Sequence, residues 1–383
     1  MSKNVAIIGI GQTTYEKRKL KQNREEMIFE AATKALADAG ITREQVDSVV
    51  LDAYDLADGV AIASATSAAP AGAHNKDETR LSDDGAFAVC LAYMEIMSGL
   101  SNITLVVAWH KNCGDWNLIT NLSFEPFCQR PFALNQVTTD AIQVVKFMEK
   151  YGFTEEHAAK VIVRNRLHAA NNPLADKKTP LTVKDIMKSR AVAWPLKELD
   201  LPPDSEGACA MVLASEDYVD RNRKVAWIKG LGWAADSYYL GNRDLAELGS
   251  LKIAANMAYR MAGIDKPAEQ IDVAEICGST AYHELAAYQA LGFCGVGEVA
   301  KLVESDEYFN RKPHVNPSGG ITSSNPHAAS GLVRVAEAAL QVMGRAEKRQ
   351  VKNTKNALAH GIGGMCNQCN CILVLAANRV KNG

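Results

Sequence analysis

Three short segments in the second half of the chain carry side chains that could do chemistry. Cys277 begins a Cys-Gly-Ser-Thr segment after an expected strand, Asn325 lies in Ser-Asn-Pro, and His360 begins His-Gly-Ile-Gly-Gly. A thiol can act as a nucleophile, an imidazole as a general base, and an amide can stabilise an oxyanion. In the first half, Ser82 adds a hydroxyl just before an expected helix. These four residues are the candidate catalytic groups.

Each candidate also has a structural interpretation. A free cysteine such as Cys277 is commonly buried as an apolar residue, and a lone histidine such as His360 often has a structural role. Asn325 belongs to a residue type that favours turns. Ser82 and Asp83 together are typical of a helix cap. We favour the cap for Ser82, because a neighbouring carboxylate is a poor base for an alcohol. For Cys277 and His360 both interpretations stay open.

A glycine-rich turn at 316–320, Asn-Pro-Ser-Gly-Gly, leads towards a helix that the spacing of apolar residues predicts over Ala328–Gly344. Glycines let the backbone approach a ligand closely, and free N–H groups at a helix start can face a thioester oxygen or a phosphate. A tightly packed turn without a ligand fits the residue types equally well. The candidate substrate-binding residues are Asn316, Gly319, Gly320, His327, Cys366 and Cys369.

Cys366 and Cys369 form a Cys-x-x-Cys pair near the end of the chain. One such pair is half of a zinc site, and the sequence holds no second pair to complete it. We therefore expect no metal ligands in this chain. The two cysteines could line a pocket, although packing in the core is the commoner role for free thiols.

Composition restricts the class of protein. The chain has 383 residues, of which 47% are hydrophobic and 22% charged, with a net charge of −2. These values suit a soluble globular protein, and the lack of a basic block argues against a nucleic-acid partner. The apolar run at 5–11 has no charged flank or cleavage site, so it predicts a strand rather than a signal peptide. Nine scattered cysteines favour a reduced, cytoplasmic setting.

An internal repeat organises the chain. Residues 30–49 contain a helix, an Ala-Gly-Ile stop, a short loop and a strand that begins with a hydrophobic-Asp pair, and residues 253–274 repeat that order. We infer two β/α halves, 1–220 and 221–383. An insertion at about 112–190 occurs in the first half, and such insertions usually shape a site. We expect the pocket where the halves meet, with catalytic groups mainly from the second half.

The repeat and several motifs resemble the thiolase superfamily, in its archaeal and sterol-carrier-like branch. The motifs are Glu-Gly-Ala at 206–208, His-Ala-Ala-Asn-Asn-Pro at 168–173 and the turn at 316–320. The resemblance covers nearly the whole chain. It implies an α/β fold of five layers, α/β/α/β/α, with an inserted loop domain and dimerisation through the first-half sheets.

The catalytic positions of that family differ in this chain. Counting along the sequence puts Ser82 where the family has its nucleophilic cysteine, while Cys90 lies inside the following helix. Asn325 stands where the family has the histidine of Gly-His-Pro. Cys277 takes the place of a family histidine, and His360 takes the place of the cysteine in Cys-x-Gly, as histidine also does in the sterol-carrier branch.

The resemblance implies an enzyme that makes or breaks a carbon–carbon bond beside a coenzyme A thioester. Our first expectation is a non-standard degradative β-ketoacyl-CoA thiolase subunit of β-oxidation, with coenzyme A as substrate and no permanently bound cofactor. The specific type that the resemblance suggests is the benzoylsuccinyl-CoA thiolase. A retro-aldolase like the thiolase-like steroid aldolases is the alternative, although those have tyrosines at the positions of Cys277 and Asn325. A catalytically silent scaffold is the third class.

The same branch commonly works with a small partner subunit that carries a zinc ribbon and an OB fold. The resemblance therefore implies such a partner here, around a homodimer core within a heterotetramer. It also implies that the chain alone is incomplete.

Overall fold

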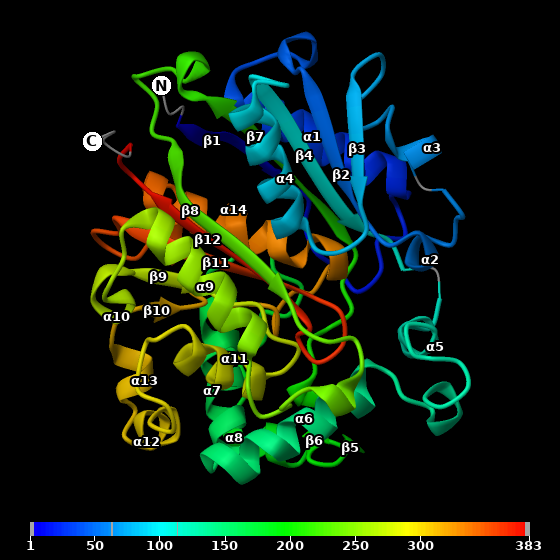
Figure 1. Cartoon of the computed structure of the whole chain (residues 1–383), viewed down its shortest axis with the longest axis vertical. Helices are drawn as coiled ribbons and strands as arrows, with labels where there is room; N and C mark the ends of the chain where they lie inside the picture. Colours follow the sequence, from blue (N-terminus) through cyan, green and yellow to red (C-terminus); the bar gives the residue numbers. More distant parts are fainter. Residues whose placement is uncertain (1–3, 63, 113, 380–383) are drawn as a thin grey trace.

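A ten-stranded sheet organises the structure, a computed structural model that describes residues 4–62, 64–112 and 114–379 (Figure 1). Its strand order is β10-β9-β11-β12-β8-β1-β7-β4-β2-β3. The first-half strands are β1 (Val5–Gln12), β2 (Ser48–Asp52), β3 (Asp77–Leu81), β4 (Ile103–His110) and β7 (Gly207–Ser215). The second-half strands are β8 (Ala226–Ala235), β9 (Val273–Glu275), β10 (His314–Val315), β11 (Asn356–Gly363) and β12 (Cys369–Ala376).

The two halves of the sheet repeat one pattern of pairing. In the first half, β3, β2 and β4 are parallel neighbours, and β7 and β1 follow in antiparallel pairs. In the second half, β10, β9 and β11 are parallel, and β12 and β8 follow in antiparallel pairs. The β1–β8 pair joins the halves, through Ala6 with Trp227 and Ile7 with Ala226. This order agrees with the repeat in the sequence, while the exact domain boundaries stay a prediction.

The larger helices are α1 (Arg24–Ala39), α4 (Gly85–Ser98), α6 (Gln136–Tyr151), α7 (Glu155–Ala169), α9 (Gly249–Ala262), α11 (Ala281–Ala290) and α14 (Ser330–Met343). The short ones are α2 (Asp55–Asp58), α3 (Ser64–Ser67), α5 (Trp116–Asn121), α8 (Val183–Met187), α10 (Pro267–Gln270), α12 (Val299–Glu304) and α13 (Glu307–Asn310), and a separate hairpin pairs β5 (Ala191–Ala193) with β6 (Leu196–Lys197).

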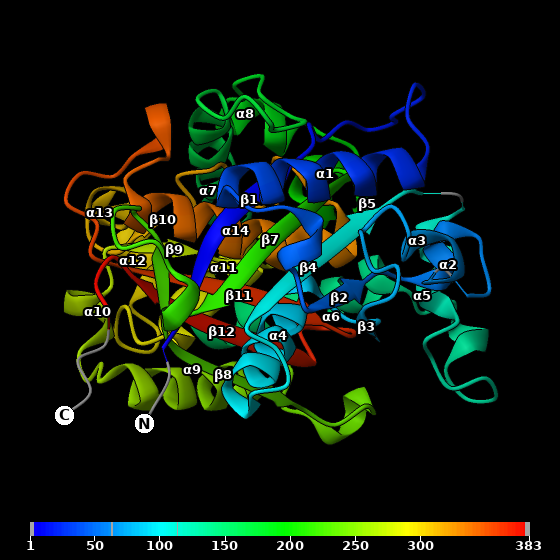
Figure 2. The same ribbon diagram turned by 90° about the horizontal axis from the view of Figure 1, so that it is seen from above.

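Side-chain alternation along the strands creates the layers. In β4, Val106 and Ala108 pack in a core with α4 and α14, while Leu105 and Val107 pack on the opposite face against α1. The second-half strands likewise face α4 and α14 on one side and α9 on the other. Figure 2 shows α1 and α9 toward opposite sides of the view. The expected layered α/β fold is confirmed, with α4 and α14, one from each half, in its central layer.

Glycines in the strands allow the outer helices to pack closely. A Cβ added at Gly9 or Gly11 would lie 2.3 or 2.1 Å from a carbonyl oxygen of α1. In the second half, Gly230 and Gly232 meet α9 in the same way, at 2.2 and 2.3 Å. The Gly-x-Gly near the N-terminus therefore serves helix–strand packing, and the repeat extends to these pairs of glycines.

The insertion contains α5, α6, α7 and α8. Helices α6 and α7 pack against α11 beneath the second-half strands, whereas α5 projects at the right of Figure 1. The helix predicted over Ala328–Gly344 is present as α14, but it begins at Ser330, after a single 3-10 turn over His327–Ala329. The two glycines that follow His360 suggested a loop there, and this was wrong, because His360 lies within β11. Across the described ranges, none of the helices has the length and apolarity that crossing a membrane requires.

Candidate active site

A cavity of about 450 Å³ takes its walls from both halves of the chain. The first half contributes the segment after β2 with the start of α2, the turn before α4, and α5 of the insertion. The second half contributes the loops after β9 and before α14, and the end of β11 with the residues that follow it. Its lining residues are Tyr54, Asp55, Leu56, Ser82, Asp83, Asp84, Trp116, Ile119, Thr120, Leu122, Ser123, Gln136, Cys277, Ser279, Ile321, Asn325, His327, Ser330, Ile362, Gly363, Gly364 and Met365.

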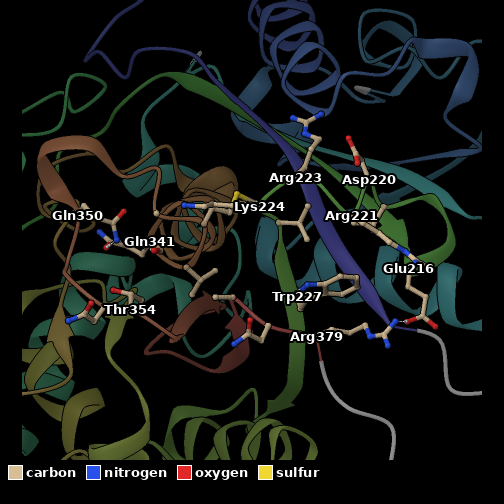
Figure 3. Close-up of a pocket in the computed structure, with 18 of the residues that line it drawn as sticks. Glu216, Asp220, Arg221, Arg223, Lys224, Trp227, Gln341, Gln350, Thr354 and Arg379 are labelled. Carbon is tan, nitrogen blue, oxygen red and sulfur yellow. Dashed lines mark hydrogen bonds and ion pairs between the residues drawn. The ribbon is translucent and has the colours of Figure 1, made fainter.

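A larger cavity, of about 1050 Å³, lies at the joint between the halves and has a different character. Figure 3 shows charged side chains of both signs around it, including Arg221, Lys224 and Asp220. Arg379 and Glu216 form an ion pair at its edge, at 3.4 Å. None of the candidate residues lies there, so the smaller cavity is the candidate active site.

Two carboxylates lie on the first-half side of the cavity, with Asp83 in its wall and Asp52 behind it. Asp52 ends β2 and is fully buried, and its Oδ1 accepts a hydrogen bond from the backbone N–H of Asp83 at 3.1 Å. Burial raises the pKa of Asp52 to about 8 and that of Asp83 to about 6. Asp83 is half-buried, lines the cavity, and its carboxylate has no hydrogen-bond partner within the described part of the chain. It is therefore a weakly hydrated base that faces the cavity.

Asp84 connects the two central helices. Its carboxylate accepts hydrogen bonds from the backbone N–H of Ala86 in α4, at 3.0 Å, and of Gly331 in α14, at 2.8 Å. Asp84 is thus the cap of α4, and the favoured interpretation of Ser82 as the cap was wrong. Ser82 is exposed, one residue before Asp83. Helix α4 begins at Gly85, directly after Asp84, whose carboxylate caps the N-terminus of α4 and also bonds the first turn of α14.

The glycines after His360 make room for these aspartates. A Cβ at Gly361 would lie 2.4 Å from Oδ1 of Asp84, and one at Gly363 would lie 1.7 Å from Oδ1 of Asp83. The His-Gly-Ile-Gly segment therefore brings the edge of β11 directly against the turn of the first half. Its close approach is what buries the two carboxylates.

Cys277 follows β9, as expected, and lines the cavity, but its side chain is fully buried. Burial raises the pKa of its thiol, and the nearby Asp84 raises it further. A thiol that holds its proton so firmly is a poor nucleophile.

His360 is fully buried and does not line the cavity. Its Nε2 lies 2.8 Å from Oδ1 of Asn370, whose Nδ2 donates to the hydroxyl of Ser250. Burial lowers the pKa of His360 to about 4. These contacts indicate a structural histidine that links β11, β12 and α9.

Asn325 and His327 both line the cavity. Oδ1 of Asn325 accepts a hydrogen bond from the hydroxyl of Ser330 at 2.8 Å, which turns the amide nitrogen away from Ser330. His327 stacks on Trp116, with ring centroids 3.8 Å apart, and its Nε2 lies 3.1 Å from Oδ1 of Asp204. Burial lowers the pKa of His327 to about 4, so this ring is neutral at pH 7.

The remaining candidates lie away from the cavity walls. Asn316 is fully buried and its side chain binds the backbone N–H of Ile276 and the carboxylate of Glu284. Gly319 and Gly320 have positive φ angles of 97° and 62° in the same buried turn. Burial raises the pKa of Cys366 to about 12 and that of Cys369 to about 11.

Sequence reasoning missed three residues of the site and the role of a fourth, Asp83, which it assigned to a helix cap. Tyr54 and Trp116 form much of the wall, and Asp52 and Asp83 carry the perturbed carboxylates. The Asp-Asp pair at the start of an apolar helix was a usable signal, because acidic side chains are rarely buried beside a core helix unless they have a specific role. Trp116 carried no signal of its own, because the position of the insertion follows from tertiary packing.

Asp52 predicts a pH-dependent stability. Between its unfolded pKa of about 3.9 and its folded pKa of about 8, the folded state holds a proton that the unfolded chain has lost. Stability therefore falls as pH rises, by roughly 2–3 kcal/mol between pH 6 and pH 8 from this group. Urea unfolding at both pH values should show a smaller loss in Asp52→Asn than in the wild type. Equal losses would contradict the prediction.

Comparisons with known proteins agree with this architecture. Residues 232–377 match the family model described as "Thiolase C-terminal domain-like". Sterol carrier protein 2 from Bos taurus is 31% identical over 392 residues, which cover 94% of this chain and 70% of the relative. An acetyl-CoA acetyltransferase from Methanothermobacter thermautotrophicus is 28% identical and covers 94% of this chain and 97% of the relative.

Solved structures extend the similarity to the whole fold. The structure titled "Ltp2-ChsH2(DUF35) aldolase" superposes with a TM-score of 0.83 at 24% identity and covers 98% of both chains. A monomeric SCP2-thiolase-like protein from Mycobacterium smegmatis superposes with a TM-score of 0.76 at 15% identity, over 98% of this chain and 77% of that one. From the sequence relatives and the family model, the chain belongs to the thiolase superfamily, in its sterol-carrier-protein-2-like branch.

Proposed function

We propose that this chain is the large subunit of a degradative β-ketoacyl-CoA thiolase in which a carboxylate replaces the usual catalytic thiol. The observation that carries the proposal is Asp83, a cavity-facing carboxylate with no hydrogen-bond partner among the described residues and a pKa raised by burial to about 6. Coenzyme A is a substrate rather than a permanently bound cofactor, and the setting is cytoplasmic.

The match of pKa values favours a thiol as the group that Asp83 deprotonates. A base of pKa about 6 lies within about 2–3 units of a free thiol near 8.5, whereas an alcohol is far less acidic. The thiol of coenzyme A therefore supplies the nucleophile, and no acyl-enzyme forms. This assignment agrees with the buried, protonated state of Cys277.

In the proposed thiolysis, one proton moves from coenzyme A to Asp83 and then to the leaving group. Asp83 takes the proton from the thiol of coenzyme A, and the sulfur attacks the β-keto carbonyl. The Nδ2 amide of Asn325 donates to the resulting oxyanion. The bond between the carbonyl carbon and the α-carbon then breaks, and the α-carbon of the departing enolate takes the proton back from Asp83. The products are two thioesters.

The cavity wall supports an acyl group with an apolar or aromatic part. Trp116, Ile119 and Leu122 of the insertion and Ile321 of the second half line it. Benzoylsuccinyl-CoA has such a part and is the specific substrate to include in a panel of β-ketoacyl thioesters.

A retro-aldolase is the second candidate, because the turn before α4 has no thiol and an aldolase shares the fold. The two reactions differ in their need for free coenzyme A. Thiolysis consumes it with a β-ketoacyl-CoA and forms two thioesters, which mass spectrometry resolves. Retro-aldol cleavage acts on a β-hydroxyacyl-CoA without free coenzyme A and releases a carbonyl compound. Cleavage of the hydroxy substrate alone would overturn the thiolase assignment, and no cleavage of either would indicate a silent scaffold.

The proposal includes a small partner subunit with a zinc ribbon and an OB fold, bound to a homodimer of this chain. The Ltp2-ChsH2(DUF35) aldolase, a solved structure of the same fold, includes a DUF35 component, which supports the pairing. The chain purified under native conditions from its source cells should co-purify with that partner. Activity should require the complex. A monodisperse, fully active isolated chain would contradict the pairing.

Replacing Ser82 with Ala is expected to leave kcat/KM within about threefold of the wild type, because the hydroxyl is exposed and caps no helix. Steady-state assays of the purified complex test this. A loss of about a thousandfold in a folded variant would make Ser82 the nucleophile.

A further inference from the structure

A cluster of three potential metal ligands lies beside the active-site cavity. His110 ends β4, Asp204 precedes β7, and His327 opens the 3-10 turn before α14. Nε2 of His110 lies 3.2 Å and Nε2 of His327 lies 3.1 Å from the same oxygen, Oδ1 of Asp204. One donor atom from each residue lies within 4.8 Å of the others.

We propose that His110, Asp204 and His327 bind one divalent transition-metal ion, with zinc as the best fit. Imidazole nitrogens bind zinc at about 2.0–2.1 Å and a carboxylate oxygen at about 2.0–2.2 Å. In a tetrahedron with such bonds the donor atoms are about 3.4 Å apart. The observed separations of 3.1 and 3.2 Å are within a few tenths of an ångström of that value.

The surroundings hold the three donors in place before any ion binds. The backbone N–H of Ser205 donates to the carbonyl oxygen of Asn325 at 3.1 Å, so the segments of Asp204 and His327 run side by side. Asn112 donates from Nδ2 to Oδ2 of Asp204 and fixes the carboxylate. Supporting contacts of this kind orient the ligands of metal sites in proteins.

Charge and access also suit a cation. His110 is buried and the His327 side chain is only 8% exposed, so both rings are held in place beside Asp204. Asp204 supplies the negative charge, and each histidine offers a lone pair on Nε2 when its proton is on Nδ1. The side chain of Asp204 is 38% exposed, which provides an entry path and an open coordination position.

A metal ion bound by this cluster would hold the imidazole ring of His327, which lines the cavity, in one orientation. Trp116 stacks on His327 and meets His110 edge-on at 5.8 Å, so it covers one side of the cluster. The sequence patterns used for zinc look for ligands a few positions apart. They miss this set, since Asp204 is separated from its two partners by 94 and 123 positions.

The test is zinc binding by the full-length chain after treatment with a chelator. Calorimetric titration with Zn²⁺ should give one equivalent, and Asp204→Asn and His110→Gln should weaken it by at least about a hundredfold. His74→Ala is the matched control, because this exposed histidine lies outside the cluster, and it should bind like the wild type. Zinc should also raise the thermal midpoint of the wild type more than that of Asp204→Asn.

Cobalt gives a readout on the wild-type protein that does not depend on how well a variant folds. Co²⁺ should produce a weak visible absorption typical of nitrogen and oxygen ligands. Intense thiolate charge-transfer bands would instead place the ion on the cysteines near Cys369. That result, the absence of binding in the wild type, or equal binding in Asp204→Asn would each overturn the proposal.

Discussion

Replacing Asp83 with Asn is expected to lower kcat/KM for a β-ketoacyl-CoA by about 10²–10⁴-fold, the usual contribution of a general base. The amide keeps the size of the side chain and cannot take a proton. Because the carboxylate has no hydrogen-bond partner among the described residues, the variant should lose little stability. Steady-state kinetics of the purified complex, with urea unfolding as a check on the fold, test this prediction.

The pH dependence gives an independent readout of the same group. Asp83 acts as a base only when ionised, so kcat/KM should rise with pH through about 6 and then level off. Burial raises the pKa of Asp52 to about 8 and that of Tyr54 well above its usual value, so these neighbours keep their protons where Asp83 ionises. Burial also raises the pKa of Asp84. Ser82→Ala is the matched control and should keep the wild-type profile. An unchanged profile in Asp83→Asn would remove Asp83 from the mechanism.

The roles of Asp83 and Asp84 show where sequence reasoning reached its limit. The sequence motifs predicted the fold and the helix after this turn, and the glycines of the facing segment, residues 361–363, were visible in the sequence. They did not predict that β11 would lie against the turn, and that contact is what raises the pKa values. Without the contact with β11, Asp83 would be an ordinary surface aspartate. Counting positions against the family pattern then points to Ser82 as the catalytic residue. The raised pKa of Asp83 depends on the tertiary contact between residues 83 and 363, which are far apart in the sequence.

His360 is a second residue whose surroundings the sequence could not predict. Two glycines after a histidine are typical of a loop, yet β11 continues through them to Gly363, which pairs with Cys369. The glycines occur there because of the facing aspartates rather than because of a turn. Histidine therefore stays in the strand, buried with Asn370, and the sequence alone could not distinguish this from a base on a loop.

The glycine-rich turn at 316–320 was predicted correctly as a turn, and the structure identifies what holds it. Ser318 donates from its hydroxyl to Oε2 of Glu275 at 2.7 Å and from its backbone N–H to Oε1 at 3.1 Å. Arg334 in α14 donates to the same carboxylate oxygen at 2.6 Å and to Ser318 at 2.7 Å. Glu275 and Arg334 are both buried. The turn is therefore fastened to α14 by a buried ion pair.

Replacing Arg334 with Met is expected to lower the free energy of unfolding by about 3–5 kcal/mol, because it leaves Glu275 buried without its cation. Urea unfolding of the full chain measures this loss. Arg345→Met is the matched control, since its ion pair with Asp38 lies at the surface, and it should cost less than about 1 kcal/mol. Similar losses in both variants would show that the buried pair does not hold the turn.

The cost of Arg334→Met should also depend on pH. Burial already raises the pKa of Glu275, and without the guanidinium this pKa rises further above its unfolded value of about 4.3. Above that value the folded variant holds a proton that the unfolded chain has lost, so its stability falls as pH rises. The variant should therefore be closer to the wild type at pH 5.5 than at pH 8. Adding Glu275→Gln removes the ionisable group, and the double variant should recover part of the stability at pH 8 and lose the difference between the two pH values.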